Sequence, residues 1–242
     1  PTSIGAYQVN LAGYYDWFAT KTNLVGDTLL WSTFIGGSYY DYGGDSALDS
    51  NGQLVLSGST YYAGTSYPWP YVYRYVNPSY STRYYFQSLF RLSANGSTRV
   101  SSVIVNGGYY WYAGGVAINP STHDVYLTGN AYYLSSYPWT NLGSSGGGYR
   151  TTGYGYYDAV VLRFNSDFSQ YLNATVTAGS TSTSYYEAGN QLALDASGNV
   201  YVMGITGIDW GTCIGPGGGS YDMFVAKYSS DLRTQYYNTR IG

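Results

Sequence analysis

The sequence is short of the residues from which catalytic and metal sites are usually built. It contains one cysteine, Cys213, one histidine, His123, and one glutamate, Glu187. A single histidine leaves little from which to build a Ser-His-Asp triad or a His-rich zinc site, and no carboxylate pair stands out for glycoside cleavage. One cysteine forbids an intrachain disulfide, so we expect a free or buried thiol, with a bridge between subunits as the alternative. The sequence indicates a non-enzymatic protein without metal or cofactor.

Charge is also scarce. Asp, Glu, Lys and Arg make up 10% of the chain, and the formal net charge is −3. An acidic balance offers no basic surface to a phosphate backbone, which argues against nucleic acid as a partner. No apolar run is long enough to cross a bilayer, so no membrane span is predicted.

Tyrosine and glycine are abundant, with 34 and 33 residues in a chain of 242. Glycine in turns beside the β-favouring Tyr, Val and Thr argues against helices. The hydrophobic content of 44% is enough for a substantial core. We therefore expect one all-β domain over residues 1–242.

One unit recurs along the chain. Each copy opens on a short segment that ends in a cation, continues through a glycine step, and closes on a hairpin with Asp, Asn and Gly in its turn. The spacing of the cations, about 70 residues, is longer than that of common propeller repeats but of the same kind. The predicted units are residues 16–60, 86–131 and 158–206, with a partial unit at 222–242.

The first unit shows the expected strands. Trp17–Thr22 and Leu29–Ile35 form one hairpin around Asn23 and Gly26-Asp27. A second hairpin turns on Asp49-Ser50-Asn51-Gly52, where Asp and Asn cap their own backbone and Gly takes positive φ. Four strands per unit are typical of a propeller blade, so we expect a β-propeller-like array of four-stranded blades, about four in all. A lead-in strand is expected at Ala6–Leu11.

The unit resembles the SBBP-type β-propeller repeats of bacterial and archaeal proteins. The resemblance rests on Trp31–Gly37, Leu194–Gly204 and Asp222–Lys227. It implies four-stranded blades in secreted or cell-surface proteins and carries no catalytic or ligand residues. The second copy departs from the pattern, because Phe86 replaces the leading Asp and Asn119 replaces the turn Asp.

Charged residues that recur in each copy are interpreted as structural anchors. The leading Asp stands five residues ahead of its cation, and an odd offset places the two side chains on opposite faces of a strand. Contacts to neighbouring strands or turns are therefore favoured over an anion-binding site. The anchors are Lys21, Arg91, Arg163, Lys227, Asp16, Asp158, Asp222, Asp49 and Asp195.

Other candidate sites have simpler explanations. Asp41, Asp45 and Asp49 with Asn51 lack the order of a calcium loop, so turn capping is preferred. Asn95 and Asn173 lie in acceptor sequences and are candidates for glycosylation. The tryptophans that follow the last strand of each unit could form sugar-stacking platforms or plugs between blades. They are Trp69, Trp139 and Trp210.

The partial fourth unit lacks its second hairpin, and a propeller removes its edges only by closing. Two completions are expected: by the lead-in strand, which would give a four-bladed ring, or by a neighbouring subunit. The hairpin available for assembly carries Asp222, Phe224, Ala226, Tyr236 and Ile241. Because neighbours on a strand face opposite ways, we expect each Tyr pair to leave one ring outward as interface material. The hypothesis is a secreted structural protein that assembles head to tail with itself into a filament or surface layer; the alternative is a carbohydrate-binding, lectin-like propeller with glycans as partners.

Overall fold

The computed structural model describes residues 2–62, 73–76, 84–106, 110–132, 148–150, 156–178, 186–208, 212–215 and 219–242. These residues form sixteen β-strands and no helix, which confirms the all-β class. The strands are β1 (Trp17–Thr22), β2 (Leu29–Ile35), β3 (Asp41–Leu48), β4 (Leu54–Tyr62), β5 (Tyr73–Val76), β6 (Tyr84–Leu92), β7 (Arg99–Asn106), β8 (Trp111–Ile118), β9 (Val125–Tyr132), β10 (Tyr157–Phe164), β11 (Tyr171–Ala178), β12 (Ala188–Leu194), β13 (Val200–Thr206), β14 (Thr212–Ile214), β15 (Asp222–Tyr228) and β16 (Gln235–Ile241).

Both predicted hairpins of the first unit form. Strands β1 and β2 have the predicted bounds, and the Asn23 side-chain oxygen accepts hydrogen bonds from the amides of Gly26, Asp27 and Thr28. In the second hairpin, a carboxylate oxygen of Asp49 caps the turn, and Gly52 adopts φ 72°. The Asn, Asp and Gly residues of the two turns therefore predicted both hairpins correctly.

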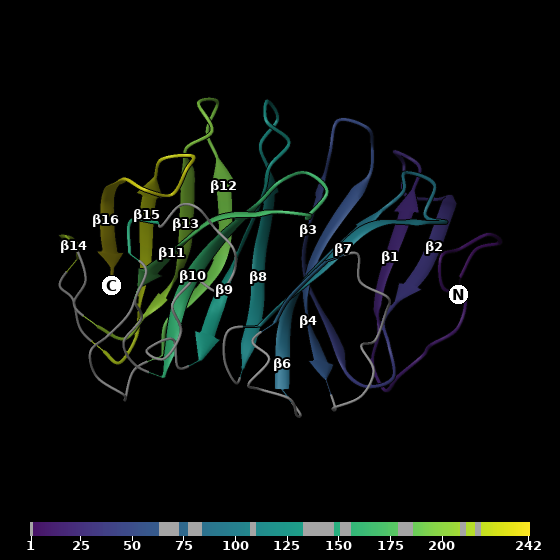
Figure 1. The fold of residues 1–242 in the computed structure, drawn as a ribbon, viewed down its shortest axis with the longest axis horizontal. Coiled ribbons are helices and arrows are strands. Elements are labelled where there is room, and N and C mark those ends of the chain that lie inside the picture. The colour runs from purple at the N-terminus through teal and green to yellow at the C-terminus, as the bar shows by residue number, and fades with distance from the viewer. Residues whose placement is uncertain are drawn as a thin grey trace.

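The strands form four sheets. Sheet I is β1-β2, sheet II is β3-β4-β6-β7-β5, sheet III is β8-β9-β10-β11, and sheet IV is β12-β13-β15-β16-β14. They follow one another in chain order across Figure 1, from β1 and β2 at the right to β15 and β16 at the left.

The prediction that each unit forms its own blade is wrong. Each of sheets II to IV combines the last two strands of one unit with the first two of the next. The reason is the long antiparallel pairing between units: β4 pairs with β6 without interruption from Leu54↔Leu92 to Tyr62↔Tyr84. We call β3–β4, β8–β9 and β12–β13 the inner hairpins. The outer hairpins are β1–β2, β6–β7, β10–β11 and β15–β16.

The expected completions of the partial unit are also wrong. Hairpin β15–β16 is not left over, because β15 pairs with β13 in the same chain. Residues Ala6–Leu11 form no strand; this segment lies along β2, where the Phe34 amide donates to the Gln8 carbonyl at 3.0 Å. The predicted lead-in strand therefore does not close a four-bladed ring.

The core lies between successive sheets. Trp17 and Ile35 of sheet I pack with Phe90 of sheet II. Larger clusters join sheet II to sheet III and sheet III to sheet IV. In sheets II and III, one face thus packs on the preceding sheet and the other face on the following one.

The outer edges of the sheets are covered. Strand β5 pairs in parallel with β7, and β14 pairs in parallel with β16. Beside β11, the Val176 amide donates to the Arg150 carbonyl at 2.9 Å. In each case the covering segment precedes the outer hairpin in the chain, as the segment around Gln8 precedes β1.

Candidate assembly site

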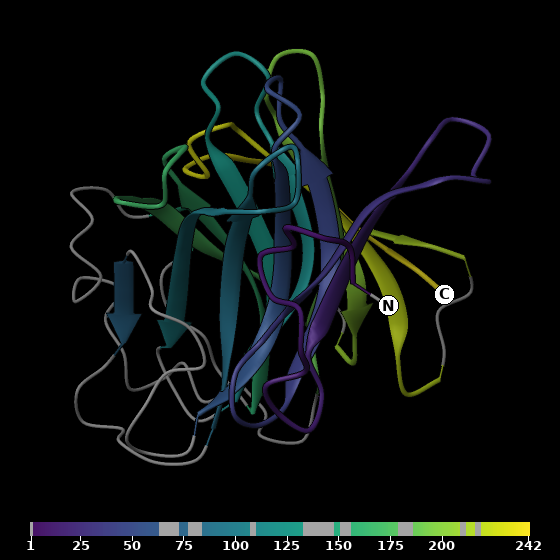
Figure 2. The same ribbon diagram turned by 90° about the vertical axis from the view of Figure 1, so that its right-hand side faces the viewer.

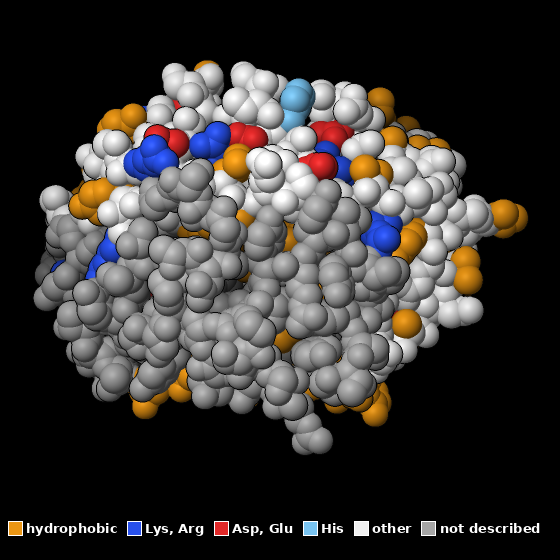
Figure 3. All heavy atoms as spheres, in the orientation of Figure 1, with side chains coloured by type: hydrophobic (Ala, Val, Ile, Leu, Met, Phe, Trp, Pro, Cys, Tyr) orange, Lys and Arg blue, Asp and Glu red, His pale blue; other side chains and the backbone are white. Residues whose placement is uncertain are grey.

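The recurring cation of each complete sheet pairs with a carboxylate in the turn of the adjacent inner hairpin. Arg91 pairs with Asp49, Arg163 with Asp124 at 2.5 Å, and Lys227 with Asp195 at 3.1 Å. The strand register is the same in all three sheets: Arg91↔Val55, Arg163↔Tyr126 and Lys227↔Tyr201. Each of these cations thus connects the first strand of one unit to the second hairpin of the preceding unit. Figure 3 shows basic and acidic side chains next to each other along the upper edge, where Figure 1 places the inner-hairpin turns.

The ion pair in sheet II is the most buried. The side chains of Arg91 and Asp49 are 6% and 4% exposed. Arg91 also donates to the Ser166 carbonyl at 2.7 Å and lies over the Phe168 ring at 5.4 Å, so it joins sheet II to sheet III. Burial lowers the pKa of Arg91, and the Asp49 carboxylate opposes that shift.

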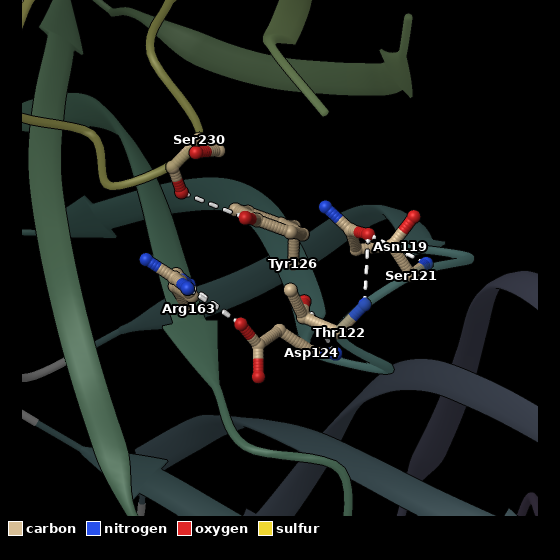
Figure 4. Close-up of polar contacts among 7 residues, drawn as sticks. All are labelled: Asn119, Ser121, Thr122, Asp124, Tyr126, Arg163 and Ser230. Carbon is tan, nitrogen blue, oxygen red and sulfur yellow. Dashed lines mark hydrogen bonds and ion pairs between the residues drawn. The ribbon is translucent and has the colours of Figure 1, made fainter. Parts of the chain in front are cut away.

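Sheet III replaces the missing turn Asp with a carboxylate from the other end of the turn (Figure 4). Asn119 keeps the capping role, because its side-chain oxygen accepts from the amides of Ser121 and Thr122. Asp124 then supplies the charge to Arg163. Sequence reasoning missed Asp124, although an acid directly before the second strand of the hairpin was a usable signal.

The equivalent position in sheet I is different. Within the described residues Lys21 forms no ion pair, and β1 pairs with β2 alone. Phe18, three residues before Lys21, is 72% exposed. Its counterparts Val160 and Phe224 are fully buried, because a preceding sheet covers them.

A groove of about 550 Å³ lies between β1 and β3. Its lining includes Tyr15, Asp16, Trp17 and Phe18 on one side and residues 41–46 on the other. Figure 2 shows the tip of the β1–β2 hairpin projecting away from the other sheets. The open edge of β1, the groove and Lys21 together form the candidate assembly site.

The acids near the groove are held by protein donors. Asp16 accepts from the Ala12 amide at 2.9 Å, Asp41 from the Gly37 amide at 2.8 Å, and Asp45 from the Val116 amide at 3.1 Å. Burial raises the pKa of Asp41 to about 6. Among the residues that the structure describes, no group of His, Cys, Asp or Glu side chains is arranged to hold a metal ion.

The other leading acids are largely buried in their own sheets. Asp222 lies 3.4 Å from the Arg240 guanidinium, and Asp158 is fully buried. Asp195 caps its turn through the Ser197 and Asn199 amides. Side-chain hydrogen bonding by Asn199 leads the causes that lower the pKa of Asp195 to about 2.

Tyrosines form a continuous row across three sheets, which we call the tyrosine ladder. Neighbouring ring centroids along it lie 4.9–6.3 Å apart, within the range of favourable aromatic contacts. The ladder consists of Tyr40, Tyr61, Tyr85, Tyr110, Tyr132, Tyr157 and Tyr186. Beside it, burial raises the pKa of Tyr112 to about 12. These rings join neighbouring sheets, whereas Tyr14, Tyr15, Tyr39 and Tyr156 are exposed.

The remaining candidates divide by location. Asn95 is exposed in the β6–β7 turn, whereas Asn173 is 7% exposed inside sheet III, so a glycan fits only the first. Cys213 lies in β14, opposite Arg240 of β16. The tryptophans proposed as a sugar platform, Trp69, Trp139 and Trp210, lie outside the described residues.

Comparisons with known proteins place this chain in no family. No protein-family model matches it, and no curated protein matches it. Within the described residues, no helix could cross a membrane.

Proposed function

We propose that the chain is a non-enzymatic structural protein, a β-propeller-like array whose copies assemble head to tail into an extracellular filament or surface layer. The observation that carries this proposal is that both ends of the row of sheets are uncovered and apolar.

At the sheet I end, Phe18 and the turn residues Leu24 and Val25 are exposed. The corresponding turns of the other outer hairpins rest on the preceding sheet. Trp31 donates to the Ala94 carbonyl at 3.0 Å, and Tyr126 donates to the Ser230 carbonyl at 2.7 Å. The β1–β2 turn is therefore shaped to rest on another sheet.

At the sheet IV end, the outward face carries Met203, Met223, Tyr237 and Ile241, all exposed. Met223 lies opposite Ile241 in the strand register, so the two share one face. The other face of the same strands packs on sheet III through Phe224 and is buried. Sheet IV thus presents the kind of face that sheets II and III use internally.

Continuing the internal stacking across copies joins two different surfaces. Such a heterologous contact extends into a filament when its rotation does not close a ring. The same repetition stabilises solenoids and propellers within one chain, where each unit contacts its neighbours. The extracellular location is supported by the resemblance to secreted repeats and by the exposed acceptor Asn95.

Mixing two end variants tests this proposal. Sedimentation velocity and negative-stain microscopy should show linear polymers for the unmodified chain. Phe18→Lys should block one end and Met223→Lys the other, so each variant alone stays monomeric while their mixture stops at dimers. Val100→Lys, a substitution at an exposed position of β7, should polymerise normally. An unmodified chain that stays monomeric at all concentrations, or a mixture that forms no dimers, contradicts the proposal.

A further inference from the structure

Among the described residues, sheet I contains an outer hairpin but no inner hairpin. Sheets II, III and IV each join one inner hairpin to one outer hairpin, but the described chain has four outer hairpins and three inner ones. Each inner hairpin is already paired, through β4–β6, β9–β10 and β13–β15. Strand β1 is therefore an outer strand whose inner partner is missing from the described residues.

We propose that the open edge of β1 binds a β-hairpin of the inner-hairpin type, carried by another polypeptide, whose turn carboxylate pairs with Lys21. This partner goes beyond the self-association proposed above and does not depend on it. Three features of the molecule fix its chemistry: the strand register, the unpaired cation and the groove.

The register of the complete sheets gives the orientation of the partner. Arg91 faces Val55, the second residue of its inner strand, and Lys227 faces Tyr201, the second residue of β13. Lys21 occupies the same position in β1. The incoming strand therefore runs antiparallel to β1, and its turn lies beside Lys21.

The charge of the partner follows from the other three cations. Arg91, Arg163 and Lys227 each bind a carboxylate in an inner-hairpin turn, even where Asn119 replaces the usual Asp and Asp124 takes over. Lys21 is exposed and forms no ion pair in the described part of the chain. A hairpin with an acidic turn would give it the same kind of partner.

The groove between β1 and β3 lies where that hairpin would stand. Inner strands of successive sheets are neighbours: the Val116 amide of β8 donates to Asp45 of β3, and Ser57 donates to the Gly114 carbonyl at 2.7 Å. An inner strand of sheet I would lie between β1 and β3 in the same way. The groove has β1 on one wall and β3 on the other, with a volume of about 550 Å³.

A second copy of this chain is a poorer occupant. The three inner hairpins that the structure describes are each paired within their own sheet, so none of them is free to bind β1 of another copy. Pairing of β1 with β1 of a second copy would bring two cations and no turn carboxylate. The chemistry favours a partner that carries an unpaired hairpin with an Asp in its turn.

The probe is a synthetic peptide of residues 186–208, which contains β12, β13 and Asp195. It is titrated into the isotope-labelled full chain at a concentration where sedimentation shows monomers, and amide shifts and exchange are followed in β1. We expect saturable binding that protects β1. Lys21→Glu should weaken it by about tenfold, because an attractive pair becomes repulsive. An Asp195→Lys peptide should restore binding to that variant, and Arg233→Glu, at another exposed cation, should change nothing.

A second arm of the experiment applies if the free peptide does not fold into a hairpin by itself. The same residues 186–208 are joined by a flexible linker to the start of the full chain, with a scrambled sequence as control. The proposal is overturned if neither arm protects β1, or if Lys21→Glu leaves binding unchanged. Protection of β1 that rises with chain concentration without peptide, and that persists in Met223→Lys, in which the filament contact is blocked, overturns it in favour of self-pairing. Hairpin binding by a chain that never polymerises would leave this inference standing while the proposed filament fails.

Discussion

At the scale of single residues, the recurring cation has the same partner type in each complete sheet but different burial. The pair Arg91–Asp49 is 6% and 4% exposed, whereas Lys227–Asp195 is 21% and 28% exposed. Removing one partner of a buried pair leaves an uncompensated charge and costs about 3–5 kcal/mol, whereas exposed pairs contribute about 0–1 kcal/mol. We expect Arg91→Ala to destabilise the chain far more than Lys227→Ala. Urea denaturation measures both, and equal losses would contradict the burial difference.

Asp41 makes stability depend on pH. Its carboxyl group is buried, and its folded-state pKa is raised from 3.8 to about 6. Between those values the folded state holds the proton and the unfolded state does not, so the contribution of Asp41 to stability is fully present at or below pH 4 and is lost as pH rises through about 6. The loss amounts to about 2–3 kcal/mol.

The check is thermal unfolding, followed by circular dichroism between pH 4 and 7. Asp41→Asn should remove the slope, because no proton is then exchanged at this position. Asp195→Asn is the control, since the pKa of Asp195 is about 2 and lies below this window. A slope that persists in Asp41→Asn would assign the pH dependence to another group.

Residue-level prediction succeeded where chemistry was local. The recurring cations and the capping role of Asp49 could be inferred from the sequence, because a turn Asp caps its own backbone. The partner of Arg163 could not, because Asn119 broke the pattern and Asp124 took its charge role from the other end of the turn. The preference for turn capping is confirmed for Asp49, which accepts from the amides of its own turn, whereas Asp45 accepts from the Val116 amide of the next sheet.

At the scale of elements, hairpin β15–β16 completes sheet IV. Strand β15 pairs with β13 over seven residues, from Val200↔Tyr228 to Thr206↔Asp222, and Phe224 and Tyr228 are fully buried. A chain that ends at residue 221 should therefore lose the packing of sheet IV and not merely an assembly contact. We expect a lower melting temperature and new binding of a hydrophobic dye. A truncated monomer with unchanged stability would contradict the pairing.

Most strands could be predicted from the sequence, but β5 and β14 were missed, Ala6–Leu11 was wrongly predicted as a strand, and the assignment of strands to sheets could not be predicted. Alternation and turn residues gave the bounds of β1 and β2 and the turn after β3. Whether β4 pairs with the hairpin before it or after it depends on contacts far apart in the chain, as in Leu54↔Leu92. A sequence repeat does not show which two hairpins share a sheet, because the period is the same wherever the repeat unit is taken to begin.

At the scale of the whole molecule, each of sheets II to IV combines strands of two neighbouring units. This changes the position at which an unpaired strand edge is found. Sequence counting placed the unfinished element at residues 222–242, whereas among the described residues the outer hairpin without an inner hairpin in its sheet is β1–β2. In the pairs Tyr39-Tyr40 and Tyr156-Tyr157, the first ring is exposed as expected, and the second ring belongs to the tyrosine ladder that joins neighbouring sheets. The site at the open edge of β1 was not predicted, because the sequence of a strand does not show whether a neighbouring strand pairs with it.

Amide hydrogen exchange of the full chain as a monomer tests the open edge of β1 most directly. The measurement compares residues 17–22 of β1 with residues 87–92 of β6, which occupy the same position in sheet II. The account predicts that β1 exchanges much faster, because within the described residues β6 is paired on both sides and β1 on one. Equal protection of the two strands would show that β1 already has a second partner, and would contradict the account.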